Sequence, residues 1–155
     1  MATLVDGDRM SILAFLRRYL TFRVNYELKL LRLLRSLNIA PVRPSKDAML
    51  LEWMGATGDY RLVIEMRGPM LLVLGISELV MENQEMPGAA AIKLLNRNVS
   101  LQGRAWSVLI YGQLRIFVVA AHCNLATCSS REFLKVLDGI TCELDVARRQ
   151  HQFNS

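Results

Sequence analysis

The segment from Pro87 to Val146 constrains the fold most, because helical and strand-like patterns follow one another there with short connections. Ala89–Leu95 is rich in alanine and leucine, which favour a helix. The apolar runs Arg104–Tyr111 and Leu114–Ala121 come next, and Gly112 between them can supply the positive φ of a tight hairpin turn. The segment therefore predicts a helix followed by two antiparallel strands.

A further helix is predicted after these strands. Ser129 and Glu132 have the spacing of a capping box, in which the two side chains satisfy free amides at a helix N-terminus. Apolar residues then recur at helical spacing, and we expect the helix to run to about Arg149. The apolar stripe comprises Phe133, Leu134, Leu137, Ile140 and Leu144.

The chain before Pro87 predicts one long helix and three strands. Apolar residues between Ser11 and Leu37 follow the 3- and 4-residue spacing of an amphipathic helix, and the segment Asn38–Asp47, with two prolines, reads as a linker. Met49–Ala56, Tyr60–Arg67 and Met70–Ile76 then read as an antiparallel meander with short turns. In the second of these strands polar and apolar residues alternate, which indicates a sheet with one covered face.

The predicted fold is thus α+β, in the order helix, three strands, helix, two strands, helix, with an antiparallel sheet and the helices packed on one face. At 155 residues the chain fits one folded domain. Within it we distinguish a basic amphipathic helix with its linker, residues 1–46, from an α+β body, residues 47–155. The longest apolar runs are far shorter than the roughly 20 residues of a membrane-spanning helix.

The positive charge of the chain is concentrated at its start. Residues 1–46 hold nine basic and three acidic side chains, a sum of +6, so the remaining residues sum to −1 within the total of +5. This basic helix could contact a membrane surface or another anionic surface, or it could be a core helix with a solvated charged face. Nucleic acid is not an expected partner, because no recognition motif accompanies the charge. The basic residues in question are Arg17, Arg18, Arg23, Lys29, Arg32 and Arg35.

No catalytic or cofactor-binding motif is found. Cys123, Cys128 and Cys142 with His122 are the only residues that could form a metal or redox group, but their spacing fits none of the usual zinc patterns. We therefore interpret them as small buried thiols and a histidine at a strand end, and we expect no metal and no cofactor. An odd number of cysteines without a secretion signal predicts a reducing, cytoplasmic location. We interpret the acidic residues Glu78, Glu82 and Glu85 as a solvated loop before Pro87.

The order of elements resembles that of the YbjN family of bacterial proteins, which shares the fold of type III secretion chaperones. The resemblance lies in three features. The first is the helix and asparagine-containing turn from Ala89 to Asn98, the second is the strand pair from Trp106 to Ala120, and the third is the final helix that opens at Ser129 and carries Phe133. With the first meander included, the resemblance covers about two-thirds of the chain.

The resemblance implies a cytoplasmic, non-enzymatic protein, either a regulator of sensory transduction or a chaperone-like homodimer that shelters an extended polypeptide. We expect the partner to contact the sheet and the helix that follows Pro87. The alternative hypothesis is a peripheral membrane or anionic-surface adaptor that acts through the basic helix. The candidate contact residues are Leu72, Leu74, Ile92, Leu95 and Trp106.

Overall fold

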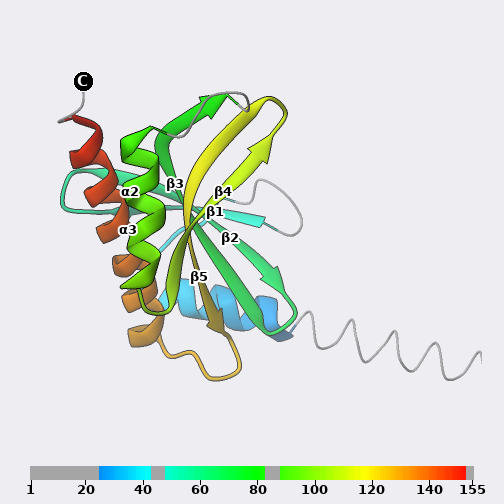
Figure 1. The fold of residues 1–155 in the computed structure, drawn as a ribbon. Helices are drawn as coiled ribbons and strands as arrows, with labels where there is room; N and C mark the ends of the chain where they lie inside the picture. Colours follow the sequence, from blue (N-terminus) through cyan, green and yellow to red (C-terminus); the bar gives the residue numbers. More distant parts are fainter. Residues whose placement is uncertain (1–24, 43–47, 83–87, 153–155) are drawn as a thin grey trace, which may run out of the picture.

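The computed structural model describes residues 25–42, 48–82 and 88–152, and it confirms the α+β fold class. Five antiparallel strands form one sheet in the order β1-β2-β3-β5-β4 (Figure 1). The strands are β1 (Ala48–Met54), β2 (Asp59–Arg67), β3 (Met70–Glu82), β4 (Arg104–Tyr111) and β5 (Leu114–Asn124). The helices are a first helix over residues 25–36, α2 (Ala89–Asn96), the short 3-10 helix η1 (Arg97–Val99) and α3 (Ser130–Gln152).

The third strand is longer than predicted. We expected it to end at Ile76, but β3 continues to Glu82 and pairs with β5 along its whole length, with a register shift between Ile76 and Val80. Glu78 and Glu82 therefore belong to β3, and their prediction as loop residues was wrong; Glu85 lies outside the described residues. The physical reason is the bulge, which lets a strand absorb extra residues and continue after a bend.

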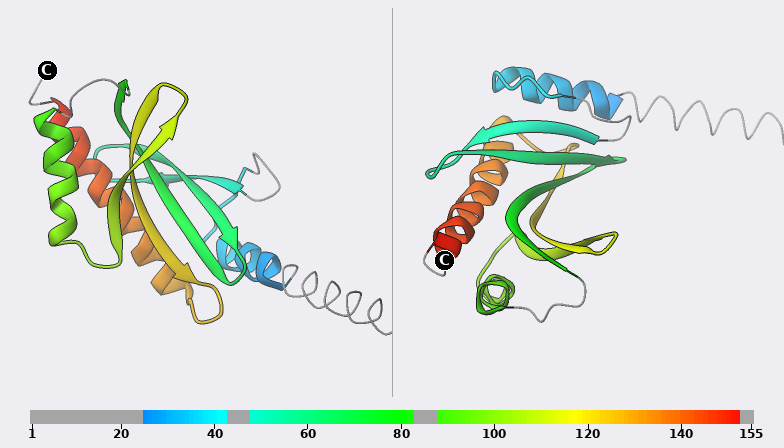
Figure 2. Two further views of the ribbon diagram at one scale, coloured as in Figure 1. Left: turned by 45° about the vertical axis from the view of Figure 1, so that its right-hand side comes forward. Right: turned by 90° about the horizontal axis from the view of Figure 1, so that it is seen from above.

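The buried residues of the described helices pack against one face of the sheet, as predicted, and Figure 2 shows α2 and α3 side by side on that face. Directly opposite residues in paired strands share a face, and the register places Leu51, Leu62, Val73 and Trp106 on the face that the helices cover. The buried residues of this face and of the helices form one core cluster. We call this side of the sheet the covered face and the other side the open face.

The first helix is part of this core. Leu30 and Leu34 are 1% and 0% exposed, and Leu33 is also buried. Two side chains of this helix bond to the segment around the start of α3: the Lys29 ammonium donates to the Ala126 carbonyl at 2.9 Å, and the hydroxyls of Ser36 and Ser130 lie 2.9 Å apart. The described half of the predicted long helix is therefore a core helix; residues 11–24 of that prediction lie outside the described residues.

Local signals at the turns and caps are confirmed where the structure describes them. The Ser129 amide donates to the Glu132 carboxylate at 2.7 Å and the Glu132 amide donates to the Ser129 hydroxyl at 3.2 Å, which is the reciprocal pattern of a capping box. Gly112 has φ of 58° in the hairpin turn between β4 and β5. None of the helices among residues 25–42 and 88–152 is both long and apolar enough to cross a bilayer.

α3 approaches the sheet closely where β3 carries a glycine. A Cβ atom at Gly75 would lie 2.9 Å from a methyl carbon of Leu144 and would also collide with Ile140. Only a residue without a side chain lets α3 pack directly on the middle of β3, so Gly75 sets the distance between helix and sheet.

Candidate functional site

The predicted contact residues do not form one surface. Leu72 and Leu74 lie in β3 on the open face, Leu72 half-buried and Leu74 buried. Ile92 and Leu95 lie on α2, on the other side of the sheet, where Ile92 is 49% exposed and Leu95 packs against the core. Trp106 is buried, and its indole N–H donates to Glu143 at 3.1 Å. Trp106 is therefore a core residue and not a surface contact residue.

Instead, the open face carries an apolar patch across three neighbouring strands. Val80 and Leu109 both lie opposite Ile116 in the register, and Tyr111 lies opposite Leu114. No described helix covers this face, although large apolar side chains gather on it. Such a patch is typical of an interaction surface. We call it the open-face patch, and its exposed residues are Ile76, Val80, Leu109, Tyr111 and Leu114.

The patch reaches the edge strand β4, whose outward backbone groups are hydrogen-bonded in its first half only. The side chain of Asn98 pairs with the backbone of Trp106: its oxygen accepts from the Trp106 amide at 2.6 Å, and its nitrogen donates to the Trp106 carbonyl at 2.8 Å. Outward-facing backbone groups recur at every second residue, so those of Val108 and Ile110 also point away from β5. Within the described part of the chain they meet no backbone partner outside the sheet. Half of the β4 edge is therefore available for pairing.

The opposite edge of the sheet is less open. The isolated bridge between Val42 and Leu50 occupies the outer side of β1, with backbone hydrogen bonds of 2.9 and 2.7 Å. The edge most accessible to a further strand is thus the one beside the open-face patch.

On the covered face, a buried carboxylate fixes the turn between β1 and β2. Asp145 of α3 accepts hydrogen bonds from the amides of Ala56 and Thr57 and from the hydroxyls of Thr57 and Tyr60, at 2.5 to 3.0 Å. Burial alone would raise the pKa of Asp145, but these donors together lower it to about 2. Asp145 is therefore an ionised anchor with all its partners in place.

Arg148, one turn further along α3, bridges β3 and the same turn. Its guanidinium donates to Glu78 at 2.8 Å and to the Thr57 carbonyl at 3.0 Å, and it lies 4.4 Å from the centre of the Tyr60 ring. The side chain of Glu78 is 65% exposed, so this ion pair contributes little to stability on its own. Arg148 nevertheless links Glu78 of β3 to Thr57 in the turn that leads into β2.

A second buried carboxylate, Glu143, joins α3 to η1 and β4. Arg97 donates to it through two nitrogens at 2.8 and 2.9 Å, and Trp106 donates its indole N–H. Burial alone would raise the pKa of Glu143. The hydrogen bonds from Arg97 and Trp106 and the charges of Arg97 and Arg104 together outweigh this effect, so the pKa is lower than its ordinary value. These contacts tie α3 to η1 and β4 and hold Glu143 as an ionised acceptor, while the buried Nε of Arg104 beside it has no hydrogen-bond partner in the described part of the chain.

A cavity of about 380 Å³ lies between β2, β3, α2 and α3. Its lining combines apolar side chains, including Leu79, Leu94 and Leu144, with charged residues such as Arg148. This volume is in the range of cavities that hold small organic ligands.

The basic residues predicted as a surface fall into two groups. Lys29, Arg32 and Arg35 lie on the exposed side of the first helix, and Lys29 also bonds to the Ala126 carbonyl. Arg17, Arg18 and Arg23 lie outside the described residues.

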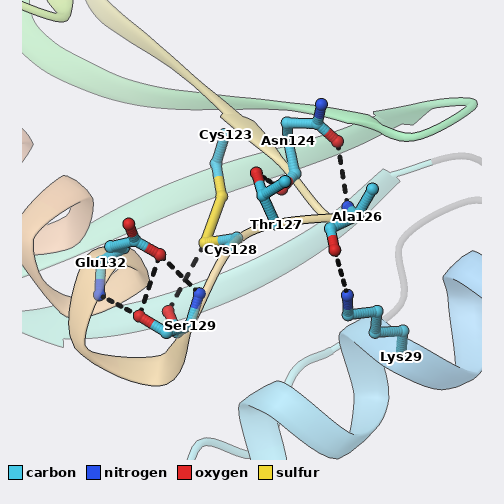
Figure 3. The surroundings of a disulfide bond; sticks show 8 residues. All are labelled: Lys29, Cys123, Asn124, Ala126, Thr127, Cys128, Ser129 and Glu132. Atoms are coloured by element: carbon cyan, nitrogen blue, oxygen red, sulfur yellow. Dashed lines mark hydrogen bonds between the residues drawn. A yellow bond between two sulfur atoms is a disulfide. The ribbon is translucent and has the colours of Figure 1, made fainter.

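Two of the three cysteines are paired, which the sequence interpretation missed. Cys123, at the end of β5, and Cys128 form a disulfide (Figure 3), with their Cα atoms 6.4 Å apart. The prediction of free thiols at these two positions was therefore wrong, because the turn after β5 returns the chain to within bonding distance. Cys142 is a free and exposed thiol on α3, so the prediction that it is a buried thiol was wrong. In the described ranges, no three metal-ligating side chains come together.

Comparison with family models, with curated proteins and with solved structures finds no match for this chain. The resemblance to the YbjN family thus stays a prediction, and the function must be inferred from the geometry described above.

Proposed function

We propose that this protein is a non-enzymatic binding protein that acts as a homodimer and holds an extended polypeptide segment, as a chaperone-like or regulatory member of the YbjN type would. The observation that carries the proposal is the open-face patch beside the half-open edge of β4. Main-chain pairing at a sheet edge and pockets for alternate side chains are the means by which folded domains hold extended peptides.

The chemistry of the surface suits this use. An extended polypeptide presents side chains alternately to two sides, and the open-face patch offers apolar positions in register on β3, β5 and β4. Uncovered patches and apolar sheet edges promote aggregation unless a partner covers them. The exposed open-face patch and the half-open β4 edge are therefore expected to be covered by a partner.

The edge also fits a second copy of the chain. If two copies of β4 pair antiparallel about a two-fold axis at Leu109, Val108 of each copy faces Ile110 of the other. Both residues direct free backbone groups outward, so the pairing satisfies them reciprocally. The two sheets then form one continuous sheet, and the two open-face patches form one apolar platform for a polypeptide.

Peptide selection from a random displayed library tests the binding function. We expect the full-length protein to enrich peptides in which apolar residues alternate with polar ones. The variant Val80→Glu places a charge in the open-face patch, and we expect it to weaken binding of the enriched peptides by at least about tenfold, because a buried unpaired charge is costly.

Leu28→Glu is the matched control, since Leu28 is 47% exposed, close to the 48% of Val80, and lies on the first helix, which packs on the covered face. It should bind the peptides as the wild type does. Failure to enrich any peptide, or equal binding by Val80→Glu, would contradict the proposal.

A further inference from the structure

The cavity between the sheet and the helices originates from a split in the sheet. β2 and β3 are paired from Arg67 and Met70 as far as Leu62 and Gly75, and no further. Beyond this point β2 continues back to Asp59, while β3 enters its bulge. The two strands diverge, and α2 and α3 close the space behind them without filling it.

The interior of the cavity suits an apolar molecule. Leu79, Leu94, Leu144 and the small side chains of Ala90 and Ala147 line it. An apolar cavity of about 150 Å³ is enough to bind benzene, so the about 380 Å³ found here accommodates a molecule of roughly two rings.

One polar atom lacks a partner here. The amide oxygen of Gln150, a residue that lines the cavity, is buried and has no hydrogen-bond partner in the described part of the chain. A buried acceptor without a donor costs free energy, and such groups in folded proteins usually indicate a water molecule or a ligand. The missing group is a hydrogen-bond donor.

The charged residues in the cavity lining give no preference for a charged molecule. Arg61 and Arg148 are balanced by Asp59 and Glu78, and Arg148 is already paired with Glu78. A charged ligand would be repelled by the like charges as well as attracted by the opposite ones. A neutral ligand is not repelled by either.

From these four observations we propose that the cavity is a binding site for a neutral, mainly apolar small molecule of about two rings that carries one hydroxyl or N–H donor. The apolar body occupies the space between β3, α2 and α3, and the donor bonds to Gln150. This inference concerns a different site from the proposed polypeptide binding on the open face, and Ile76 is the residue that the cavity lining shares with the open-face patch.

A pair of probes that differ only in the donor tests the proposal on the full-length protein. We expect 2-naphthol to bind saturably, with amide chemical-shift changes confined to the lining residues in two-dimensional NMR. 2-Methoxynaphthalene has the same rings without the donor, and we expect it to bind about tenfold more weakly, as the loss of one hydrogen bond to a buried acceptor predicts.

Three variants locate the site. Ala90→Phe fills the cavity from α2 and should abolish saturable binding, whereas Ala89→Phe, at the exposed neighbouring position that does not line the cavity, should leave it unchanged. Gln150→Leu removes the acceptor and should make the two probes bind equally. Circular dichroism on each variant checks that the fold is kept.

Three outcomes would overturn the inference. The first is the absence of saturable binding of either probe to the wild type. The second is binding that survives Ala90→Phe in a folded variant, and the third is a preference for 2-naphthol that survives Gln150→Leu.

Discussion

At the scale of single residues, Asp145 is the anchor that joins α3 to the turn between β1 and β2. The partners of Asp145 are Ala56, Thr57 and Tyr60, which are between 85 and 89 positions away in the chain. Nothing local marks Asp145, so its role becomes visible only when α3 lies against the turn between β1 and β2.

The same residue gives a pH prediction. The pKa of Asp145 is about 2 in the folded protein against 3.8 ordinarily, so its contribution to stability is present above the ordinary value and is lost as the pH falls through the folded value. We expect the free energy of unfolding to drop by about 2 kcal/mol from this group between about pH 5 and about pH 2. Urea titrations across that window measure it.

Asp145→Asn should be less stable than the wild type at neutral pH and should lose less stability on acidification. Asp59→Asn, at an exposed carboxylate, is the control and should follow the wild type. An acid response of Asp145→Asn identical to that of the wild type would show that the anchor is not ionised as described.

At the scale of elements, most strands and helices were predictable because their side-chain periodicity repeats over several residues. β4 agrees with the prediction at both ends, and β2 begins only one residue earlier than predicted. β3 was cut short because Ser77 and Glu78 interrupt an apolar run, and a bulge has no signature that distinguishes it from a turn. The disulfide between Cys123 and Cys128 escaped prediction for a related reason, since it depends on the path of a loop.

The first helix supplies a prediction at this scale. Leu34 is fully buried in the core cluster, whereas Leu28 on the same helix is 47% exposed. Leu34→Ala should therefore lower the free energy of unfolding by about 2 to 5 kcal/mol, because it leaves a cavity. Leu28→Ala should cost less than about 1 kcal/mol.

Chemical denaturation of both variants makes the comparison. Similar values for the two would mean that the first helix does not dock as described. For the same reason, deletion of residues 1–36 would remove core residues, so it would not test a surface role of the basic helix separately from stability.

At the scale of the whole molecule, the essential asymmetry is that one face of the sheet holds every described helix and the other holds none. The alternation in β2 predicted this one-sided arrangement, since period-2 patterns report burial on one face. The pattern could not say that the other face is apolar near β4, because that patch is assembled from three strands with gaps between them in the sequence. It also could not separate contact residues from core residues, as Trp106 shows.

Dimerisation is the prediction that belongs to this scale. The wild type should have twice the 17.6 kDa mass of one chain in light scattering after size exclusion, and high salt should not dissociate it, since backbone hydrogen bonds and not ion pairs join the two β4 strands. Ile110→Pro removes an outward N–H at the edge of the sheet, where proline is tolerated, and should give a monomer. Leu28→Glu, with its charge on the first helix, should remain a dimer. A monomeric wild type, or a dimeric Ile110→Pro, would contradict pairing through β4.

The contacts of the first helix also bear on how the chain is made. Lys29 and Ser36 bond to Ala126 and Ser130, partners 97 and 94 positions later in the chain. During synthesis the helix therefore leaves the ribosome on the order of 10 s before the surface on which it docks exists. Throughout that interval the leucines on the apolar side of the helix stay exposed, so this segment is the part of the described chain where early aggregation is expected during synthesis.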